Sequence, residues 1–99
     1  MLFEWNETKA RQNWQKHRVS FEEAATVFED PGCVEVPDEA HSTATEVRSF
    51  RIGRSLHRRI LLVVFTERGH NHGEEIIRII SARPATKKER EAYVRAHDV

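Results

Sequence analysis

The order of apolar and polar positions predicts two helices in the first third of the chain. Asn6 is a suitable N-cap for a helix that runs to about Lys16. Ser20 and Glu23 have the spacing of a capping box, in which each side chain bonds a free backbone amide of the other residue, so a second helix should begin there. The apolar residues of this second helix fall on one face: Phe21, Ala24, Ala25 and Phe28.

Four strands and a last helix are predicted after the Asp30-Pro31-Gly32 turn. The expected strands cover residues 33–36, 45–52, 59–67 and 75–83. Thr86 and Glu89 have capping-box spacing and predict a helix to about Ala96. Short connections favour antiparallel pairing. The predicted fold class is therefore α+β: two N-terminal helices, a four-stranded mainly antiparallel sheet and a C-terminal helix, in one domain over residues 1–99.

Charge divides the chain into two unequal parts, although the formal net charge is zero. Residues 1–46 contain 4 Lys/Arg and 10 Asp/Glu, a balance of −6, and residues 47–90 contain 11 Lys/Arg and 4 Asp/Glu, a balance of +7. Either the two parts neutralise each other in the fold, or the second presents a basic face to a polyanion such as RNA.

The chain shows no sign of export or membrane insertion. It has one cysteine, Cys33, so no intramolecular disulfide can form, which favours a reducing cytoplasm. Residues 1–6 do not resemble a signal peptide, and the longest apolar run, residues 60–65, is too short to cross a bilayer. A cytoplasmic protein without membrane contact is expected.

Most catalytic motifs are missing. There is no glycine-rich phosphate loop, no Gly-x-Ser-x-Gly and no acidic cluster suited to two-metal chemistry. The His70-Asn71-His72 segment lacks the further ligands that a structural zinc requires. We therefore expect neither a metal nor a cofactor. If the protein is an enzyme, it should act on a phosphate group with Arg, Lys, His and Glu side chains.

Two arginines near strand ends are candidate phosphate clamps, because a guanidinium carries a permanent charge and a planar fork of donors. Arg68 follows the predicted central strand, with Thr66 on the same face, and Arg83 ends the last strand. If these two strands form a hairpin, pairing alone does not bring Arg68 and Arg83 together. The structural alternative is that Arg83 holds the C-terminal helix and Arg68 pairs with Glu74.

Two titratable groups are candidate proton acceptors. His17 lies between the predicted helices beside Lys16, and imidazole titrates near neutral pH. The alternative role for His17 is a helix C-cap that interacts with the helix dipole. Glu46 and Arg48 are one residue apart on a strand and share a face, so they form either a base beside an anion-binding arginine or a structural ion pair with a neighbouring strand.

An ordered set of segments resembles the BrnT family of bacterial toxins over residues 3–93. The segments are Phe3-x-Trp5, Lys16-His17-x-Val19 to Ala24, Val27-Phe28-x-Asp30, Arg51-x-Gly53, Leu62 to Val64-x-Thr66-x-Arg68, and Ile77 to Arg83 followed by Ala85 to Arg90. Two positions depart from the family pattern. Asn6 replaces Asp but keeps the capping role, and Arg18 replaces Gly, which indicates a turn that tolerates a side chain without needing glycine for a left-handed backbone.

The resemblance implies a RelE-like fold and endoribonuclease activity that inhibits translation, on RNA that is free or bound to the ribosome. It also implies a BrnA-like ribbon-helix-helix antitoxin, with operator DNA bound only through the complex. A homodimer and a two-to-two assembly with the antitoxin are both open.

Our mechanistic hypothesis uses the 2′-OH of RNA as nucleophile, without metal. Arg68 and Arg83 clamp the phosphate, Arg51 and Lys16 bind RNA, and Thr66 orients a clamp or donates to phosphate. His17 or Glu46 accepts the 2′ proton, and the other of the two, or a basic residue, protonates the leaving 5′ oxygen. The alternatives are an RNA- or protein-binding module without catalysis, and a structural partner whose basic face docks an acidic segment.

Overall fold

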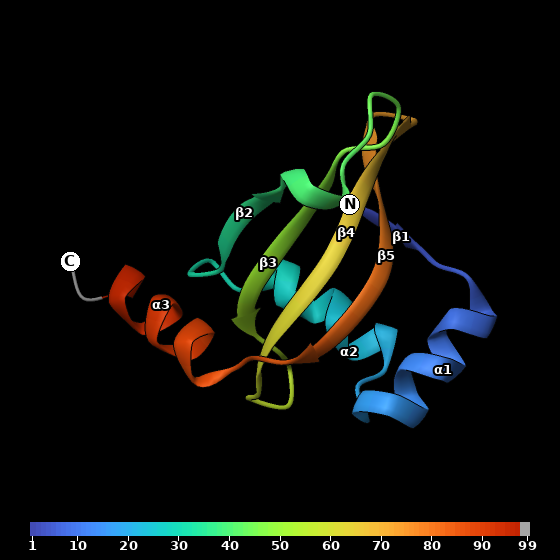
Figure 1. Ribbon diagram of the computed structural model, residues 1–99. Coiled ribbons are helices and arrows are strands. Elements are labelled where there is room, and N and C mark those ends of the chain that lie inside the picture. The colour runs from blue at the N-terminus through green and yellow to red at the C-terminus, as the bar shows by residue number, and fades with distance from the viewer. Residues whose placement is uncertain (98–99) are drawn as a thin grey trace.

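Five strands form one mixed sheet in the computed structural model, which describes residues 1–97 (Figure 1). The strands are β1 (Leu2–Glu4), β2 (Val34–Asp38), β3 (Arg48–Arg54), β4 (Ile60–Asn71) and β5 (Glu74–Pro84), in the spatial order β1-β5-β4-β3-β2. Neighbours are antiparallel except β1, which is parallel to β5. The α+β class is confirmed, but the prediction of four strands is wrong, because β1 gives the sheet a fifth, parallel strand.

The predicted helix starts are close to the observed ones. α1 (Glu7–His17) is capped by Asn6, whose Oδ1 accepts a hydrogen bond from the Lys9 amide at 3.0 Å. α2 (Phe21–Thr26) is short and continues into a 3₁₀ turn, Val27–Glu29. α3 (Lys87–His97) begins with the predicted reciprocal pair: the Thr86 amide donates to Glu89, and the Glu89 amide donates to Thr86. No helix among residues 1–97 is long and apolar enough to span a membrane.

The strand limits differ from the predicted ones at both ends of the sheet. β3 begins at Arg48 rather than residue 45, and β4 continues through the expected loop as far as Asn71. His72 and Gly73, both with positive φ, make the turn to β5. Pro37 lies in β2, an edge strand, where a residue without an amide hydrogen is tolerated.

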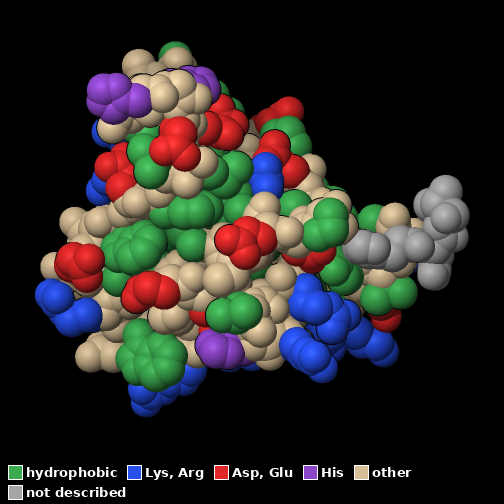
Figure 2. All heavy atoms as spheres, turned by 180° about the vertical axis from the view of Figure 1, so that it is seen from behind, with side chains coloured by type: hydrophobic (Ala, Val, Ile, Leu, Met, Phe, Trp, Pro, Cys, Tyr) green, Lys and Arg blue, Asp and Glu red, His purple; other side chains and the backbone are tan. Residues whose placement is uncertain are grey.

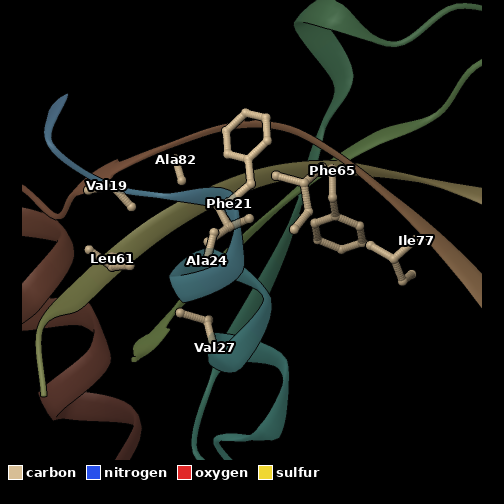
Figure 3. Close-up of a cluster of buried hydrophobic side chains, with 10 residues drawn as sticks. Val19, Phe21, Ala24, Val27, Leu61, Phe65, Ile77 and Ala82 are labelled. Carbon is tan, nitrogen blue, oxygen red and sulfur yellow. The ribbon is translucent and has the colours of Figure 1, made fainter. Parts of the chain in front are cut away.

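The main core lies between the sheet and the first two helices, on what we call the helix-bearing face. Figure 3 shows its buried side chains, which come from α2 and the segments just before and after it, and from β4 and β5. The labelled members are Val19, Phe21, Ala24, Val27, Leu61, Phe65, Ile77 and Ala82. Burial of each large aliphatic or aromatic side chain contributes about 1.5–3 kcal/mol, so this face supplies most of the hydrophobic stabilisation.

The opposite side of the sheet, which we call the open face, is covered at one end only. There Tyr93 of α3 packs with Ile52 of β3 and Leu62 of β4. In Figure 1 α3 lies beside this end, away from the β4–β5 hairpin. Among residues 1–97, no other helix covers the rest of the open face.

An ion pair between the partly exposed Arg59 and the buried carboxylate of Glu23 joins α2 to the segment between β3 and β4. Arg59 Nε donates to Glu23 Oε2 at 3.0 Å, Arg59 Nη2 contacts Oε1, and Ser55 Oγ donates to Oε2 at 2.7 Å. The predicted capping box is therefore half formed. Ser20 accepts from the Glu23 amide at 3.0 Å, but the Glu23 carboxylate points to Arg59.

Arg18 makes a left-handed turn between α1 and α2. Its φ is 55° and its ψ is 36°, and its amide donates to the Trp14 carbonyl at 2.8 Å. The turn does tolerate a side chain, as predicted, although the backbone has the conformation that glycine adopts most easily. Two contacts offset the cost of the left-handed backbone. The Arg18 guanidinium lies 5.7 Å from the centroid of the Trp14 ring, and the Arg18 carbonyl accepts a hydrogen bond from Arg59.

Asn13 protects the part of β5 that β1 does not reach. Its side-chain amide donates to the carbonyls of Ala82 and Val19 at 2.8 and 2.9 Å, and its Oδ1 accepts from the Ala82 amide at 3.1 Å. The side chain thus replaces a neighbouring strand and joins α1 to the sheet, which explains why a polar residue is buried there.

Replacing Asn13 with alanine is expected to destabilise the protein by about 2–3 kcal/mol, because buried backbone groups lose their partners. Urea unfolding monitored by tryptophan fluorescence measures the change as a lower midpoint. Gln12→Ala, at the adjacent exposed position of the same helix, is the control and should unfold near the wild-type midpoint. Equal midpoints for the two variants would contradict the edge-capping role.

Candidate functional site

A group of charged side chains lies on the open face near the β4–β5 hairpin. Arg48 is the register partner of Thr66, and Thr66 is the partner of Arg78, so these three residues share a face of the sheet. Arg68 lies two residues beyond Thr66, and Glu46 precedes β3. We call Glu46, Arg48, Arg68 and Arg78 the hairpin-end cluster.

The ion pairs of the hairpin-end cluster are accessible to solvent. Arg48 Nε donates to Glu46 Oε1 at 3.1 Å, and both side chains are about one-third exposed. Arg68 and Arg78 both approach Glu4 of β1, at 3.6 and 3.8 Å. Such long, exposed pairs contribute little stability, so an incoming phosphate can compete for the arginines. The pairing of Arg68 with Glu74 predicted from the sequence is replaced by pairing with Glu4.

Thr66 supports this cluster from below. Its side chain is buried, and its hydroxyl donates to the Val47 carbonyl at 2.7 Å. A hydroxyl has one hydrogen to donate, so of the two predicted roles for Thr66 the geometry favours positioning over donation to phosphate. The bond fixes the backbone next to Arg48.

The loop from residue 39 to residue 47 contributes His41 to a histidine–carboxylate pair with Asp38, which was not among the residues predicted for the site. His41 Nδ1 lies 3.0 and 3.1 Å from the two carboxylate oxygens of Asp38, which is buried, while the His41 ring is 68% exposed. Asp38 is the register partner of Arg48. Figure 1 places this loop and the β4–β5 hairpin at the same end of the sheet.

A second basic group lies at the end of α1. His17 ends the helix, Lys16 precedes it, and Arg83 on β5 is close enough to influence its titration. Burial, followed by the positive charges of Lys16 and Arg83, lowers the pKa of His17 below its ordinary value. We call Lys16, His17 and Arg83 the helix-end cluster. It adjoins a shallow hollow of about 280 Å³ lined by Lys9, Gln12, Asn13, Lys16, His17, Ile80 and Ser81.

Arg83 also holds α3 to the sheet. Its Nη1 and Nη2 donate to the two oxygens of Glu89 at 2.7 and 2.9 Å. Hydrogen bonding from Arg83, together with the bonds from Thr86, outweighs burial and lowers the pKa of Glu89. The structural role that the sequence offered for Arg83, clamping the C-terminal helix, is confirmed.

The register separates the two predicted clamps. Arg83 pairs with Leu62, whereas Arg68 lies six residues further along β4, roughly 20 Å away at about 3.3 Å per residue. One phosphate cannot contact both. The predicted site residues therefore fall into two groups: Arg68 and Glu46, the partner of Arg48, toward the hairpin, and His17, Lys16 and Arg83 toward the other end of β5.

Arg51 lies on the other side of the sheet from the hairpin-end cluster. Its guanidinium is 4.6 Å from the centroid of the Phe28 ring and pairs with Glu35 at 3.0 Å. Two residues on, a side chain at Gly53 would come within 2.9 Å of Val27 and Cys33. The Arg51-x-Gly53 segment thus packs the helix-bearing face, and the sequence prediction that Arg51 binds RNA has no support in its position.

The helix-bearing face does not present a uniform basic surface. Figure 2 shows it from behind, with acidic side chains spread over it and Lys and Arg gathered along its lower part, at both left and right. Among residues 1–97, no three His, Cys, Asp or Glu side chains come together in a way that could hold a metal ion. The chemistry that the open face offers is phosphate binding by guanidinium groups, with carboxylate and imidazole nearby for proton transfer.

Comparison with known proteins gives one family and one fold. The family model described as "Ribonuclease toxin, BrnT, of type II toxin-antitoxin system" matches residues 5–89. The crystal structure of the Brucella abortus ribonuclease toxin BrnT superimposes with a TM-score of 0.61 at 23% identity, covering 88% of this chain and 100% of that one. The search of curated proteins finds no match.

Proposed function

Because this chain belongs to the BrnT family of ribonuclease toxins of type II toxin–antitoxin systems, we propose that it is an endoribonuclease that cleaves RNA through the 2′-OH without a metal ion. The observation that supports this most is the hairpin-end cluster: three arginines and a glutamate on an uncovered sheet face. Arg48, Arg68 and Arg78 bind the scissile phosphate and stabilise the charge that develops on it.

Glu46 is the proton acceptor in this scheme, since its carboxylate lies beside Arg48 and is open to solvent. It removes the 2′ proton, the 2′ oxygen attacks phosphorus, and the bond to the 5′ oxygen breaks. The products are a 2′,3′-cyclic phosphate and a 5′-hydroxyl. The helix-end cluster binds the RNA backbone further along β5, with Lys16 exposed to solvent and Arg83 exchanging one of its bonds to Glu89 for phosphate.

The RNA substrate itself gives the decisive test. Purified protein should cut a short RNA in the presence of EDTA and should stop cutting when the 2′ oxygen at the mapped cleavage site is methylated, because the nucleophile is then blocked. Gel analysis with end-group mapping measures both results. Cleavage that requires a divalent cation, or that continues on the methylated RNA, would contradict the mechanism.

A binding module without catalysis is the second candidate function. It is favoured by the ion pairs, because Arg48, Arg68 and Arg78 each have a carboxylate within 4 Å. Such a module would retard ordinary and 2′-O-methylated RNA equally in a gel and would cut neither.

Membership of a type II system implies an antitoxin partner. In our proposal this is a BrnA-like ribbon-helix-helix protein that covers the open face with acidic side chains and binds operator DNA as part of the complex. Expression of the chain alone should arrest growth, and co-expression of the antitoxin should restore it. In vitro, the antitoxin should compete with RNA.

A further inference from the structure

The 39–47 loop brings a second proton-transfer group to the hairpin-end cluster. The loop starts after Asp38 and ends before Arg48, and these two residues are register partners on adjacent strands. Ser42 closes it: its Oγ donates to the Asp38 carbonyl at 2.6 Å and accepts from the Arg48 amide at 3.0 Å. The loop is therefore fixed to the sheet at the position of Arg48.

Both ends of this loop carry a titratable side chain. On one side, a 3₁₀ turn, Glu39–His41, places the imidazole of His41 against Asp38. On the other side, the Glu46 amide donates to Thr43 Oγ1 at 3.0 Å, and the Thr43 amide donates to the Glu46 carbonyl at 2.8 Å. Glu46 then meets Arg48. Arg48 thus contacts the Glu46 carboxylate, and its register partner, Asp38, holds the His41 imidazole.

Asp38 determines which imidazole nitrogen is available. An ionised carboxylate only accepts hydrogen bonds, so Nδ1 must carry the hydrogen, and Nε2 is left to exchange a proton with a ligand. Asp38 is buried and His41 is exposed, an arrangement that fixes the ring from below and presents Nε2 to solvent. A histidine serving only to satisfy a buried carboxylate would not need an exposed ring.

We propose that His41 is the general acid of the reaction, with Asp38 as its positioning residue; this proposal rests on the ribonuclease activity proposed above. Glu46 takes the proton of the 2′-OH, and the 2′ oxygen forms its bond to phosphorus. The bond from phosphorus to the 5′ oxygen breaks, and that oxygen takes the proton from Nε2. Glu46 and His41 then return to their starting forms by exchange with water, so the reaction consumes no net proton.

His41→Ala should slow single-turnover cleavage of a short RNA by roughly 10²–10⁴-fold, the usual contribution of a general acid. Binding of the same RNA with a 2′-deoxy residue at the mapped cleavage site should not change. His57→Ala is the matched control, because His57 is exposed in the turn at the other end of the sheet. It should cleave at the wild-type rate.

A substrate with sulfur in place of the 5′ bridging oxygen identifies the acid. A thiol has a pKa of about 8.5 against about 15.7 for water, so a thiolate leaves without a proton. On this substrate His41→Ala should regain the wild-type rate, whereas Glu46→Gln should stay slow. Asp38→Asn should show a smaller version of the His41 pattern, because an amide can donate as well as accept and no longer fixes the tautomer.

The outcomes separate the two proposals. If the wild-type protein cleaves and His41→Ala is equally fast, the role of His41 is overturned and the ribonuclease function stands. If His41→Ala is slow but the sulfur substrate does not restore its rate, His41 is not the acid. A wild-type protein that binds RNA and never cleaves it overturns both.

Discussion

Replacing Arg48 with alanine is expected to lower the rate of RNA cleavage by about 10²–10³-fold, the usual cost of removing one preorganised donor to a transition-state charge. Arg48 is one of four register partners on adjacent strands, which run across the sheet in the order Asp38, Arg48, Thr66 and Arg78. Its Nε contacts the proposed base, Glu46. Loss of its guanidinium therefore removes a phosphate contact and also leaves Glu46 without its partner.

Arg51→Ala is the matched control, since it removes the same side chain from the same strand but from the helix-bearing face. Its rate per folded molecule should equal that of the wild type. Arg48→Lys should fall between the wild type and Arg48→Ala, because an ammonium keeps the charge but loses the planar fork. Single-turnover rates on one mapped RNA site measure all three variants. Equal loss in the Arg48 and Arg51 variants would contradict an active site on the open face.

The parts of the fold that were predicted correctly depend on neighbouring residues. Asn6 caps α1, and Thr86 and Glu89 cap α3, because each needs only a backbone amide two or three residues away. The antiparallel pairing of β4 with β5 follows from a short connection in the same way. Signals of this kind can be read directly from sequence.

The fifth strand was not predictable from such signals. β1 is three residues long and pairs with a strand more than seventy positions later. Glu23 was misread for a related reason. Its spacing from Ser20 matches a capping box, but Arg59 offers its carboxylate a charged, bidentate partner, and charge-assisted bonds are about twice as strong as neutral ones.

Candidate site residues could be chosen from the sequence by their chemical type. Which of them lie together in space depends on the register of the strands. A hairpin of the last two strands predicts that Arg68 and Arg83 need not meet, and the observed register agrees. β5 has one extra residue, Ile80, opposite the step from Val64 to Phe65. Such a bulge shifts the alternation of side chains between the two faces, so the face of each neighbouring residue could not be predicted by counting along the sequence. His41 and Asp38 lay in a stretch read as a polar loop, where only a His three residues after an acidic residue could have indicated the pair.

Arg59→Ala is expected to have the largest effect on stability, about 3–5 kcal/mol, the usual cost of leaving a buried charge without its partner. The Glu23 side chain is 4% exposed, and Ser55 would be its remaining partner in the network. Since small domains are stable by about 5–15 kcal/mol, this single change removes a large share of the total. Arg95→Ala, on the exposed surface of α3, removes the same charge and should unfold near the wild-type midpoint.

Acid should reduce the difference between Arg59→Ala and the wild type. Burial alone would raise the pKa of Glu23, but the hydrogen bonds from Arg59 and Ser55 outweigh it and lower that pKa below its ordinary value. A lowered pKa in the folded state stabilises the protein fully above the unfolded-state pKa of about 4.3, and this stabilisation is lost as the pH falls through the folded-state value. Without Arg59, burial is opposed only by the Ser55 hydrogen bond and the charge of His57, so the variant protonates Glu23 at a higher pH than the wild type and gains stability relative to it on acidification. Urea unfolding at neutral pH and near pH 4 measures both differences, and a constant gap between the two proteins would show that Arg59 acts through packing instead of charge.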